Sequence, residues 1–249
     1  MDCFKNLQKI EFVLTYACSS NCKHCSQGEH KREGVCLDSS YANAAIKSLA
    51  KNYNLQTALV FGGEPLLFYD TACKIIECAR ECKIPKRQII TNGYFTKDRE
   101  VMREVAHKLF DCGVNDLLLS ADAFHQETIP IEIVKQFATE LKFAGVPTRI
   151  QPAWLCSKND DNPYNKKTRE IVKRLCDIGF IESNGNVVFF EGNAKKYLAD
   201  YFKGDLPQNP YVEDPCDVRC ISVDPYGKTL GKNICNDNVL NIIKDYNPR

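Results

Sequence analysis

The sequence predicts an α/β fold in which a parallel sheet forms an open or partial (β/α)6 barrel, followed by a small C-terminal β-hairpin extension. Short apolar runs alternate six times with helical patterns, which implies a parallel sheet with right-handed crossovers. Six units are too few for a closed eight-fold barrel. Nearly every unusual polar motif directly follows an apolar run, and ligands bind at those strand ends in parallel sheets.

Six segments read as strands because they are apolar or alternating and end at a turn signal or a polar motif. The second is a short apolar run closed by Gly62 and Gly63, which is typical of a strand buried on both faces. Asn92-Gly93 closes the third. The expected strands are 9–15, 57–61, 87–91, 116–120, 148–151 and 186–190.

Helical patterns separate these strands. Asp38 or Ser39 is the expected N-cap of the first helix, because short polar side chains accept hydrogen bonds from the free N–H groups there. Gly145 suits the position just after the fourth helix. The expected helices are 38–51, 71–82, 98–110, 131–143, 166–176 and 194–201.

A linker is expected over 204–215, where a glycine and three prolines interrupt the pattern. Beyond it, Ile221 and Val223 alternate with polar residues before an Asp-Pro-Tyr-Gly turn and Thr229. This pattern suggests a β-hairpin with cysteines at both feet. We therefore expect a barrel unit over 1–203 and a linker with a small extension over 204–249.

The composition is ordinary for a globular protein except for its cysteines. A net charge of +1 argues against nucleic acid as a partner, and no apolar run approaches the ~20 residues of a membrane span. The first residues lack the apolar segment of a signal peptide, so a cytoplasmic location is expected. Fourteen cysteines in such a chain indicate metal ligation or redox chemistry, and hint at a host living with little oxygen.

Cys18, Cys22 and Cys25 form a C-x3-C-x2-C motif in the loop after the first strand. Three thiolates this close can hold three corners of a [4Fe–4S] cube and leave the fourth iron open to a small molecule. A structural zinc knuckle is the alternative. It would need a fourth cysteine or histidine at a fixed spacing, and His24 lies badly for that between two of the cysteines.

Gly62-Gly63-Glu64-Pro65 follows the second strand. The glycines allow the backbone to approach another group closely, and a carboxylate with nearby carbonyl groups suits an ammonium group. A turn with a capping glutamate is the alternative. Together with the cysteine motif, this turn resembles the signature of the radical S-adenosylmethionine (SAM) enzymes, and the resemblance covers about residues 9–201.

The resemblance implies that SAM chelates the open iron through its amino and carboxylate groups, while the Gly-Gly-Glu-Pro turn contacts the amino group. Ser120 and Asp122 would bond SAM hydroxyls or its carboxylate, although Asp122 also fits a helix cap. Asn92 would line the pocket, although Asn-Gly is also an ordinary turn. The remaining expected SAM contacts are Arg149 and Gln151, for the carboxylate, and Asn193, which stands where some relatives have arginine.

A second group, Cys216, Cys220 and Cys235, has two thiols four residues apart and a third across the expected hairpin. It resembles the twitch extension of radical SAM proteins, a truncated SPASM domain that carries an auxiliary iron–sulfur cluster, and especially the three-cysteine arrangement of molybdenum-cofactor cyclases. A zinc ribbon or free thiols are the alternatives. The fourth ligand is open between Cys156, Cys176 and the substrate.

The resemblance implies an enzyme that receives an electron from a donor such as flavodoxin or ferredoxin and cleaves SAM to a 5′-deoxyadenosyl radical. The radical would take a hydrogen atom from a substrate C–H, and the auxiliary cluster would accept an electron or bind the substrate. His125 is the candidate catalytic acid or base, although a loop histidine bonded to a neighbour is the simpler alternative.

The substrate is expected to be a peptide or a small polar metabolite. The cluster motif begins at Cys18, which leaves no room for the winged-helix domain that recruits leader peptides in some relatives and disfavours a leader-dependent peptide maturase. A glycyl-radical activating enzyme is an alternative of similar length. A two-cluster redox carrier and a zinc-stabilised binding protein are alternatives from other classes, but a carrier does not need a pocket built from six strand ends.

Overall fold

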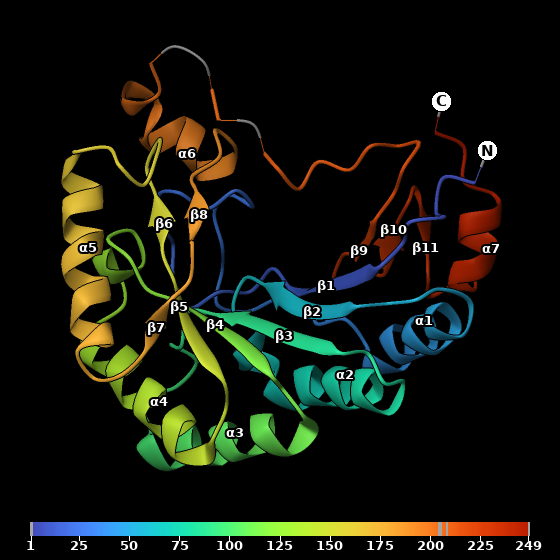
Figure 1. Cartoon of the computed structure of the whole chain (residues 1–249), viewed down its shortest axis with the longest axis horizontal. Helices are drawn as coiled ribbons and strands as arrows, with labels where there is room; N and C mark the ends of the chain where they lie inside the picture. The colour runs from blue at the N-terminus through green and yellow to red at the C-terminus, as the bar shows by residue number, and fades with distance from the viewer. Residues whose placement is uncertain (1, 204–205, 208, 249) are drawn as a thin grey trace.

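A seven-stranded parallel sheet organises the molecule, and its strands fan out across Figure 1. The computed structural model describes residues 2–203, 206–207 and 209–248. The strand order is β7-β5-β4-β3-β2-β1-β9, with every neighbouring pair parallel. Its strands are β1 (Lys9–Thr15), β2 (Thr57–Gly62), β3 (Lys86–Thr91), β4 (Asp116–Ser120), β5 (Thr148–Gln151), β7 (Ile181–Glu182) and β9 (Cys220–Val223).

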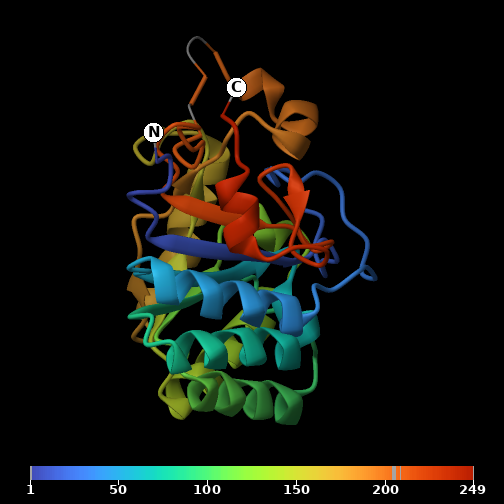
Figure 2. The ribbon, with the colours of Figure 1, turned by 90° about the vertical axis from the view of Figure 1, so that its right-hand side faces the viewer.

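Long helices follow the first five strands, as the sequence predicts, and cover one face of the sheet (Figures 1 and 2). Asp38 caps the first by accepting a hydrogen bond from the Ser40 N–H at 2.8 Å, and Gly145 ends the fourth with a φ of 82°. No helix among the described residues is long and apolar enough to cross a membrane. These helices are α1 (Ser39–Asn52), α2 (Tyr69–Glu81), α3 (Arg99–Cys112), α4 (Ile131–Ala144) and α5 (Pro163–Cys176).

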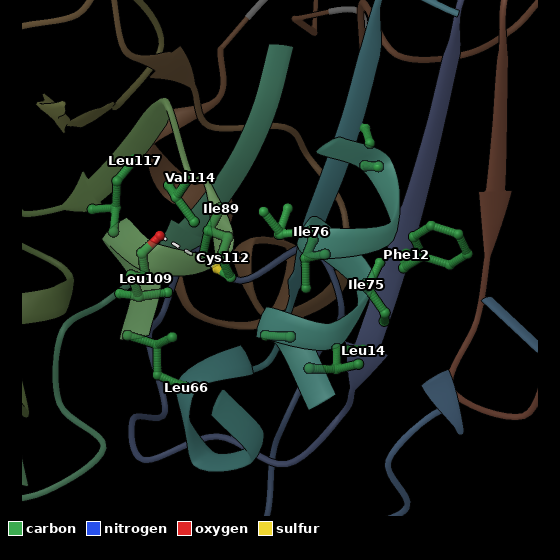
Figure 3. Close-up of a cluster of buried hydrophobic side chains, with 14 of the residues drawn as sticks. Phe12, Leu14, Leu66, Ile75, Ile76, Ile89, Leu109, Cys112, Val114 and Leu117 are labelled. Carbon is green, nitrogen blue, oxygen red and sulfur yellow. Dashed lines mark hydrogen bonds between the residues drawn. The ribbon is translucent and has the colours of Figure 1, made fainter. Parts of the chain in front are cut away.

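The main core lies between the sheet and these helices. Figure 3 shows Ile75 and Ile76 of α2 and Leu109 of α3 beside Ile89 of β3 and Phe12 of β1. All five side chains have no exposed surface. Alternate residues of the strands point into this core, so their neighbours point to the opposite, concave face of the sheet.

The sixth strand departs from the expected range of 186–190. In its place β7 pairs with β5 in the main sheet. Further along the chain, β8 (Asn186–Val187) pairs with β6 (Ala153–Trp154) in a separate two-stranded sheet. Pro152 interrupts the pairing because it has no N–H group. Gly185 passes so close to Pro152 that a Cβ there would lie 2.5 Å from the Pro152 carbonyl oxygen. The expected last helix likewise splits into α6 (Gly192–Tyr197) and a short 3-10 turn, Ala199–Tyr201.

The C-terminal segment differs from the expected hairpin. Ile221 and Val223 belong to β9, which pairs with β1 and extends the main sheet. The hairpin comes later, between β10 (Lys228–Thr229) and β11 (Lys232–Asn233), and α7 (Val239–Lys244) then packs beside α1. Both β9 side chains are fully buried, so the sheet offers them more apolar contact than a separate hairpin could. The expected start of the linker, Gly204 with Asp205, lies outside the described residues.

Candidate active site

A cavity of about 440 Å³ opens at the carboxyl ends of the parallel strands. The cysteine loop after β1 forms one wall, and the ends of β2 to β5 form the others. Inward-facing strand residues such as Leu59, Ile90 and Leu118 give it apolar sides. The predicted site residues that border the cavity are Cys18, Cys22, Cys25, Gly62, Gly63, Asn92, Ser120, Asp122, His125 and Gln151.

Each of the three loop cysteines has a polar partner for its sulfur. The amide of Asn92 lies 3.6 Å from Cys18 Sγ, and Ser20 Oγ lies 2.9 Å from Cys22 Sγ. His30 Nε2 lies 3.0 Å from Cys25 Sγ. Burial raises the pKa of Cys18 to about 12 and also raises that of Cys22, so these thiols stay protonated until a metal displaces the protons.

Gly62 and Gly63 are required because the cysteine loop packs directly on them. A Cβ on Gly63 would lie 2.1 Å from the Ala17 carbonyl oxygen, and one on Gly62 would lie 2.5 Å from that of Thr15. Hydrogen bonds of 2.8 Å run from the Gly63 N–H to the Thr15 carbonyl and from the Glu64 N–H to the Ala17 carbonyl. The glycines therefore set the position of the loop against β2.

Glu64 does not border the cavity, contrary to the role expected for its carboxylate, and neither does Pro65. The side chain is fully buried and accepts hydrogen bonds from Leu66 N, Thr91 Oγ1 and Asn92 N at 2.7–2.8 Å. Burial raises the pKa of Glu64 to about 7, although these three donors oppose the shift. Glu64 thus ties the end of β2 to the end of β3, and the backbone of the turn faces the cavity.

Asn193 also acts on the loop rather than in the cavity. Its Nδ2 donates to the Cys22 carbonyl at 3.0 Å, and its backbone N–H donates to the Cys25 carbonyl at 2.9 Å. Gly192, with a φ of 48°, packs on the same segment, where a Cβ would meet the carbonyl oxygens of Cys25 and Ser26 at 2.4 Å. The start of α6 therefore holds the cysteine loop from the side opposite β2.

Asp122 and His125 form a hydrogen-bonded pair in the turn after β4. His125 Nδ1 lies 2.9 Å from Asp122 Oδ2, and the carboxylate also accepts from the N–H groups of Phe124, His125 and Ala153. Burial alone would raise the pKa of Asp122, but the adjacent His125 lowers it to about 2. Burial also opposes protonation of His125, but the Asp122 charge outweighs it and raises the pKa of the imidazole.

The family model of the Radical SAM superfamily matches residues 12–203, which include the cysteine loop, the Gly-Gly-Glu-Pro turn and all strands from β2 to β7. The chain belongs to the radical SAM superfamily. Members of this superfamily use a [4Fe–4S] cluster and SAM. Three thiols on one cavity, with no fourth cysteine bordering it among the described residues, fit a cluster that keeps one iron open.

Sequence relatives cover part of the chain. It is 22% identical over 126 residues to the putative peptide biosynthesis protein YydG of Bacillus subtilis, over 51% of this chain and 39% of that protein. It is 24% identical over 123 residues to a probable GTP 3′,8-cyclase of Methanocaldococcus jannaschii, over 49% of this chain and 39% of that protein. The matched segments thus span about two fifths of each of these two relatives.

Solved radical SAM structures share the fold over nearly the whole chain. The structure of native anSMEcpe with bound AdoMet superimposes with a TM-score of 0.59 at 14% identity, over 97% of this chain and 81% of that one. The structure of BtrN in complex with AdoMet and 2-DOIA gives 0.52 at 16% identity, over 96% and 82%. The α/β fold predicted from the strand–helix alternation is confirmed.

β5 carries two side chains that were predicted to contact SAM, and only one of them borders the cavity. Gln151 borders the cavity and is hydrogen-bonded to Ser183. Arg149 instead makes an ion pair of 2.7 Å with Asp116, at the amino end of β4, and does not border the cavity. The opposite charge of Asp116 holds the Arg149 guanidinium at the amino end of the strands, away from the cavity in which SAM was expected to bind.

The C-terminal cysteines are not gathered at one point. Cys220 pairs with Lys9 at the amino end of β9, and Cys216 is exposed four residues earlier. Cys235 lies past the carboxyl end of β9, with its sulfur 3.8 Å from the Tyr226 carbonyl oxygen. Of the candidates for a fourth ligand, Cys156 donates to the Tyr201 carbonyl, and Cys176 ends α5. The auxiliary cluster therefore stays a prediction.

Among the residues that contact the cysteine loop or its thiols, sequence reasoning did not assign such a contact to Ser20, His30 or Gly192. Ser20 lies inside the motif, but a serine between two cysteines carries no signal of its own. His30 reaches back across the loop and also bonds the Tyr16 carbonyl at 2.8 Å, a contact that only the folded loop creates. Gly192 could have been recognised from the sequence, since a glycine just before a helical pattern and close to an expected strand end often marks a close approach of two backbones.

Proposed function

We propose that the chain cleaves SAM reductively at a cluster held by Cys18, Cys22 and Cys25 and removes a hydrogen atom from a substrate C–H. The observation that carries this proposal is the shared cavity: the three thiols, the Gly62-Gly63 turn and the ends of β3 to β5 border one space of about 440 Å³. Its apolar sides suit a reaction from which water must be excluded. The bound cluster would supply the electron that converts SAM into methionine and a 5′-deoxyadenosyl radical.

The chain's own residues would position SAM against the loop. Backbone carbonyl groups of the Gly62-Gly63 turn are available to the amino group of SAM, in place of the Glu64 carboxylate, which is fully used inside the protein. Ser120 and Gln151 offer hydroxyl and amide groups at the ends of β4 and β5. Asn92 would donate a hydrogen bond to the Cys18 thiolate and so favour its ligating form.

His125 is proposed as the catalytic group that faces the substrate. It borders the cavity, and its Nδ1 is held by Asp122, so the ring has one orientation and keeps a proton at that nitrogen. An exogenous carrier such as flavodoxin or ferredoxin would deliver the electron to the cluster. The proposed substrate is a peptide or a small polar metabolite: the similarity to YydG, named for peptide biosynthesis, favours the first, and the similarity to GTP 3′,8-cyclases favours the second.

The decisive experiment measures 5′-deoxyadenosine formed from SAM and dithionite by protein purified without oxygen and reconstituted with iron and sulfide. Replacing Cys18, Cys22 and Cys25 together by alanine should abolish the product, because no thiolate is left to hold the cluster. A control with Cys36, Cys82 and Cys176 replaced, none of which borders the cavity, should retain it. Reductive cleavage by the first variant would overturn the assignment.

The auxiliary cluster has its own readout in the same samples. Two clusters correspond to about eight irons per chain and one cluster to about four. If Cys216, Cys220 and Cys235 come together on a second cluster, the wild type holds about eight irons. The Cys220→Ala and Cys235→Ala variants would then hold fewer while still forming 5′-deoxyadenosine. About four irons in the wild type, or no loss in either variant, would remove the auxiliary cluster and leave the SAM-cleaving site untouched.

A further inference from the structure

Two histidines and one carboxylate converge on the cavity wall beside the cysteine loop. His24, Asp122 and His125 each offer one ligand atom, and these three atoms lie within 4.8 Å of one another. Among the described residues this is the one group of at least three histidine, cysteine, aspartate or glutamate side chains that converges this closely. All three residues border the cavity. They come from two separate segments, the cysteine loop and the turn after β4, so tertiary folding alone brings them together.

The carboxylate of this group is held in place by backbone bonds. Asp122 has no exposed surface, and its Oδ1 accepts from the N–H groups of Phe124 and His125 at 2.9 and 3.0 Å. Its Oδ2 accepts from the Ala153 N–H at 3.0 Å in addition to His125 Nδ1. Metal-binding carboxylates are oriented by hydrogen bonds of this kind. The three bonds from backbone N–H groups would persist if an ion replaced the proton of His125.

His24 contributes an unsatisfied polar atom. Its Nδ1 is buried and has no hydrogen-bond partner within the protein. The ring is held by Phe124, with centroids 4.8 Å apart, and by the edge of His125 at 4.9 Å. A buried polar atom without a partner destabilises the fold, and unpaired atoms of this kind often mark a bound ion or ligand.

We propose that His24, Asp122 and His125 bind one divalent transition-metal ion in the cavity wall. Two imidazoles and one carboxylate suit Fe²⁺, Mn²⁺, Co²⁺ or Zn²⁺ and leave coordination positions open. In the metal-loaded protein the ion takes the place of the proton between His125 and Asp122, so His125 is then a ligand and acts as the acid or base only in the metal-free protein. Its open positions face the cavity, where an oxygen-bearing group of a substrate can bind. The ion acts as a Lewis acid and changes no oxidation state.

This site goes beyond the proposed function, because binding of the ion requires neither SAM nor a reductant. It also differs chemically from the cysteine site: its donors are nitrogen and oxygen, which accept Mn²⁺, whereas three thiolates select softer metals or iron–sulfur clusters. Mn²⁺ is therefore the probe that distinguishes the two sites in one protein.

The test adds Mn²⁺ to the cluster-loaded, oxidised wild-type protein and follows the loss of the free Mn²⁺ signal by electron paramagnetic resonance. We expect one Mn²⁺ bound per chain and its release by excess Zn²⁺. His125→Gln removes one ligand and should weaken Mn²⁺ binding by about tenfold or more. The matched control is His107→Gln, an exposed histidine on α3, which should bind as the wild type does.

His24→Phe tests the second imidazole while keeping a ring at this position in the cysteine loop. It should weaken Mn²⁺ binding with the cluster absorbance near 400 nm retained. If this variant loses the cluster, the Mn²⁺ affinity of His125→Gln alone decides whether the proposed metal site exists. No Mn²⁺ bound by the wild type, or equal binding by His125→Gln and the wild type, overturns the proposal. Formation of 5′-deoxyadenosine without added metal is scored separately, so failure of either site leaves the other testable.

Discussion

Asn193 illustrates at the scale of single residues how side chains near the cysteines act on the loop instead of on a ligand. Its amide and its backbone bind the carbonyl groups of Cys22 and Cys25, and the side chain is almost fully buried. Glu64 behaves in the same way at the end of β2. Both residues were predicted to contact SAM. In the structure their side chains instead form hydrogen bonds that hold the cysteine loop and the neighbouring strand ends in place.

Asn193→Ala should therefore loosen the cysteine loop. The substitution removes the side-chain donor of the buried Cys22 carbonyl, which keeps only the Cys25 N–H at 3.1 Å, so the lost hydrogen bond costs about 0.5–1.5 kcal/mol of folding free energy. We expect a lower urea midpoint and less iron retained after reconstitution. Asn241→Ala, at an exposed position on α7, is the matched control. Equal iron content and equal midpoints in the two variants would contradict a positioning role for Asn193.

At the scale of elements, three segments meet to shape the cysteine loop. The Gly62-Gly63 turn after β2 packs on Ala17, the Asn92 turn after β3 reaches Cys18, and the start of α6 packs on Cys25. The first two directly follow strands of the main sheet, and α6 begins five residues after the end of β8. Parallel pairing places such ends at the same edge of the sheet, so turns distant in sequence can hold one short loop from several sides.

β9 is an element of the C-terminal segment that joins the main sheet. It pairs in parallel with β1 over Lys9–Phe12, and the edge of β1 is thereby covered. The proposed division into 1–203 and 204–249 thus separates two stretches of chain that share one sheet. A strand supplied from the far end of the sequence couples the extension to the barrel, because an uncovered edge would leave unpaired backbone groups.

At the scale of the whole molecule, this shared sheet predicts cooperative unfolding. Ile221 of β9 has no exposed surface, so Ile221→Ala should lower the free energy of unfolding by about 2–5 kcal/mol. The single tryptophan, Trp154, is buried in β6, which continues the chain from β5 near the opposite edge of the sheet. Its fluorescence therefore reports unfolding far from the substitution.

The urea midpoint followed by Trp154 should shift in Ile221→Ala. The matched control, Ile181→Ala on β7, removes a side chain that is 70% exposed and should change the free energy of unfolding by about 0.5 kcal/mol or less. An unchanged Trp154 transition in Ile221→Ala would mean that the C-terminal extension unfolds separately, in agreement with two independent units.

Sequence periodicity was sufficient for the elements whose patterns are local. The strand expected over 116–120 has the same bounds as β4. Asp38 caps the start of α1 and Gly145 follows the end of α4, as expected. Caps and apolar periodicity depend on neighbouring residues, and for that reason they can be read without knowing the fold. The sixth strand was predicted wrongly because its pairing depends on Pro152, which lies between β5 and β6 and more than thirty residues earlier in the chain.

The cysteine motif and the Gly-Gly-Glu-Pro turn were enough to predict the superfamily because together they resemble its signature. The strand–helix alternation predicted the α/β fold, because repeated alternation is compatible with few folds. Tertiary structure decided which polar residues face the cavity. It turned Glu64 and Asn193 toward the backbone, paired Arg149 with Asp116, and brought His24 to Asp122 and His125. These outcomes depend on which distant segments meet at the carboxyl edge of the sheet, and no local pattern in the chain records such a meeting.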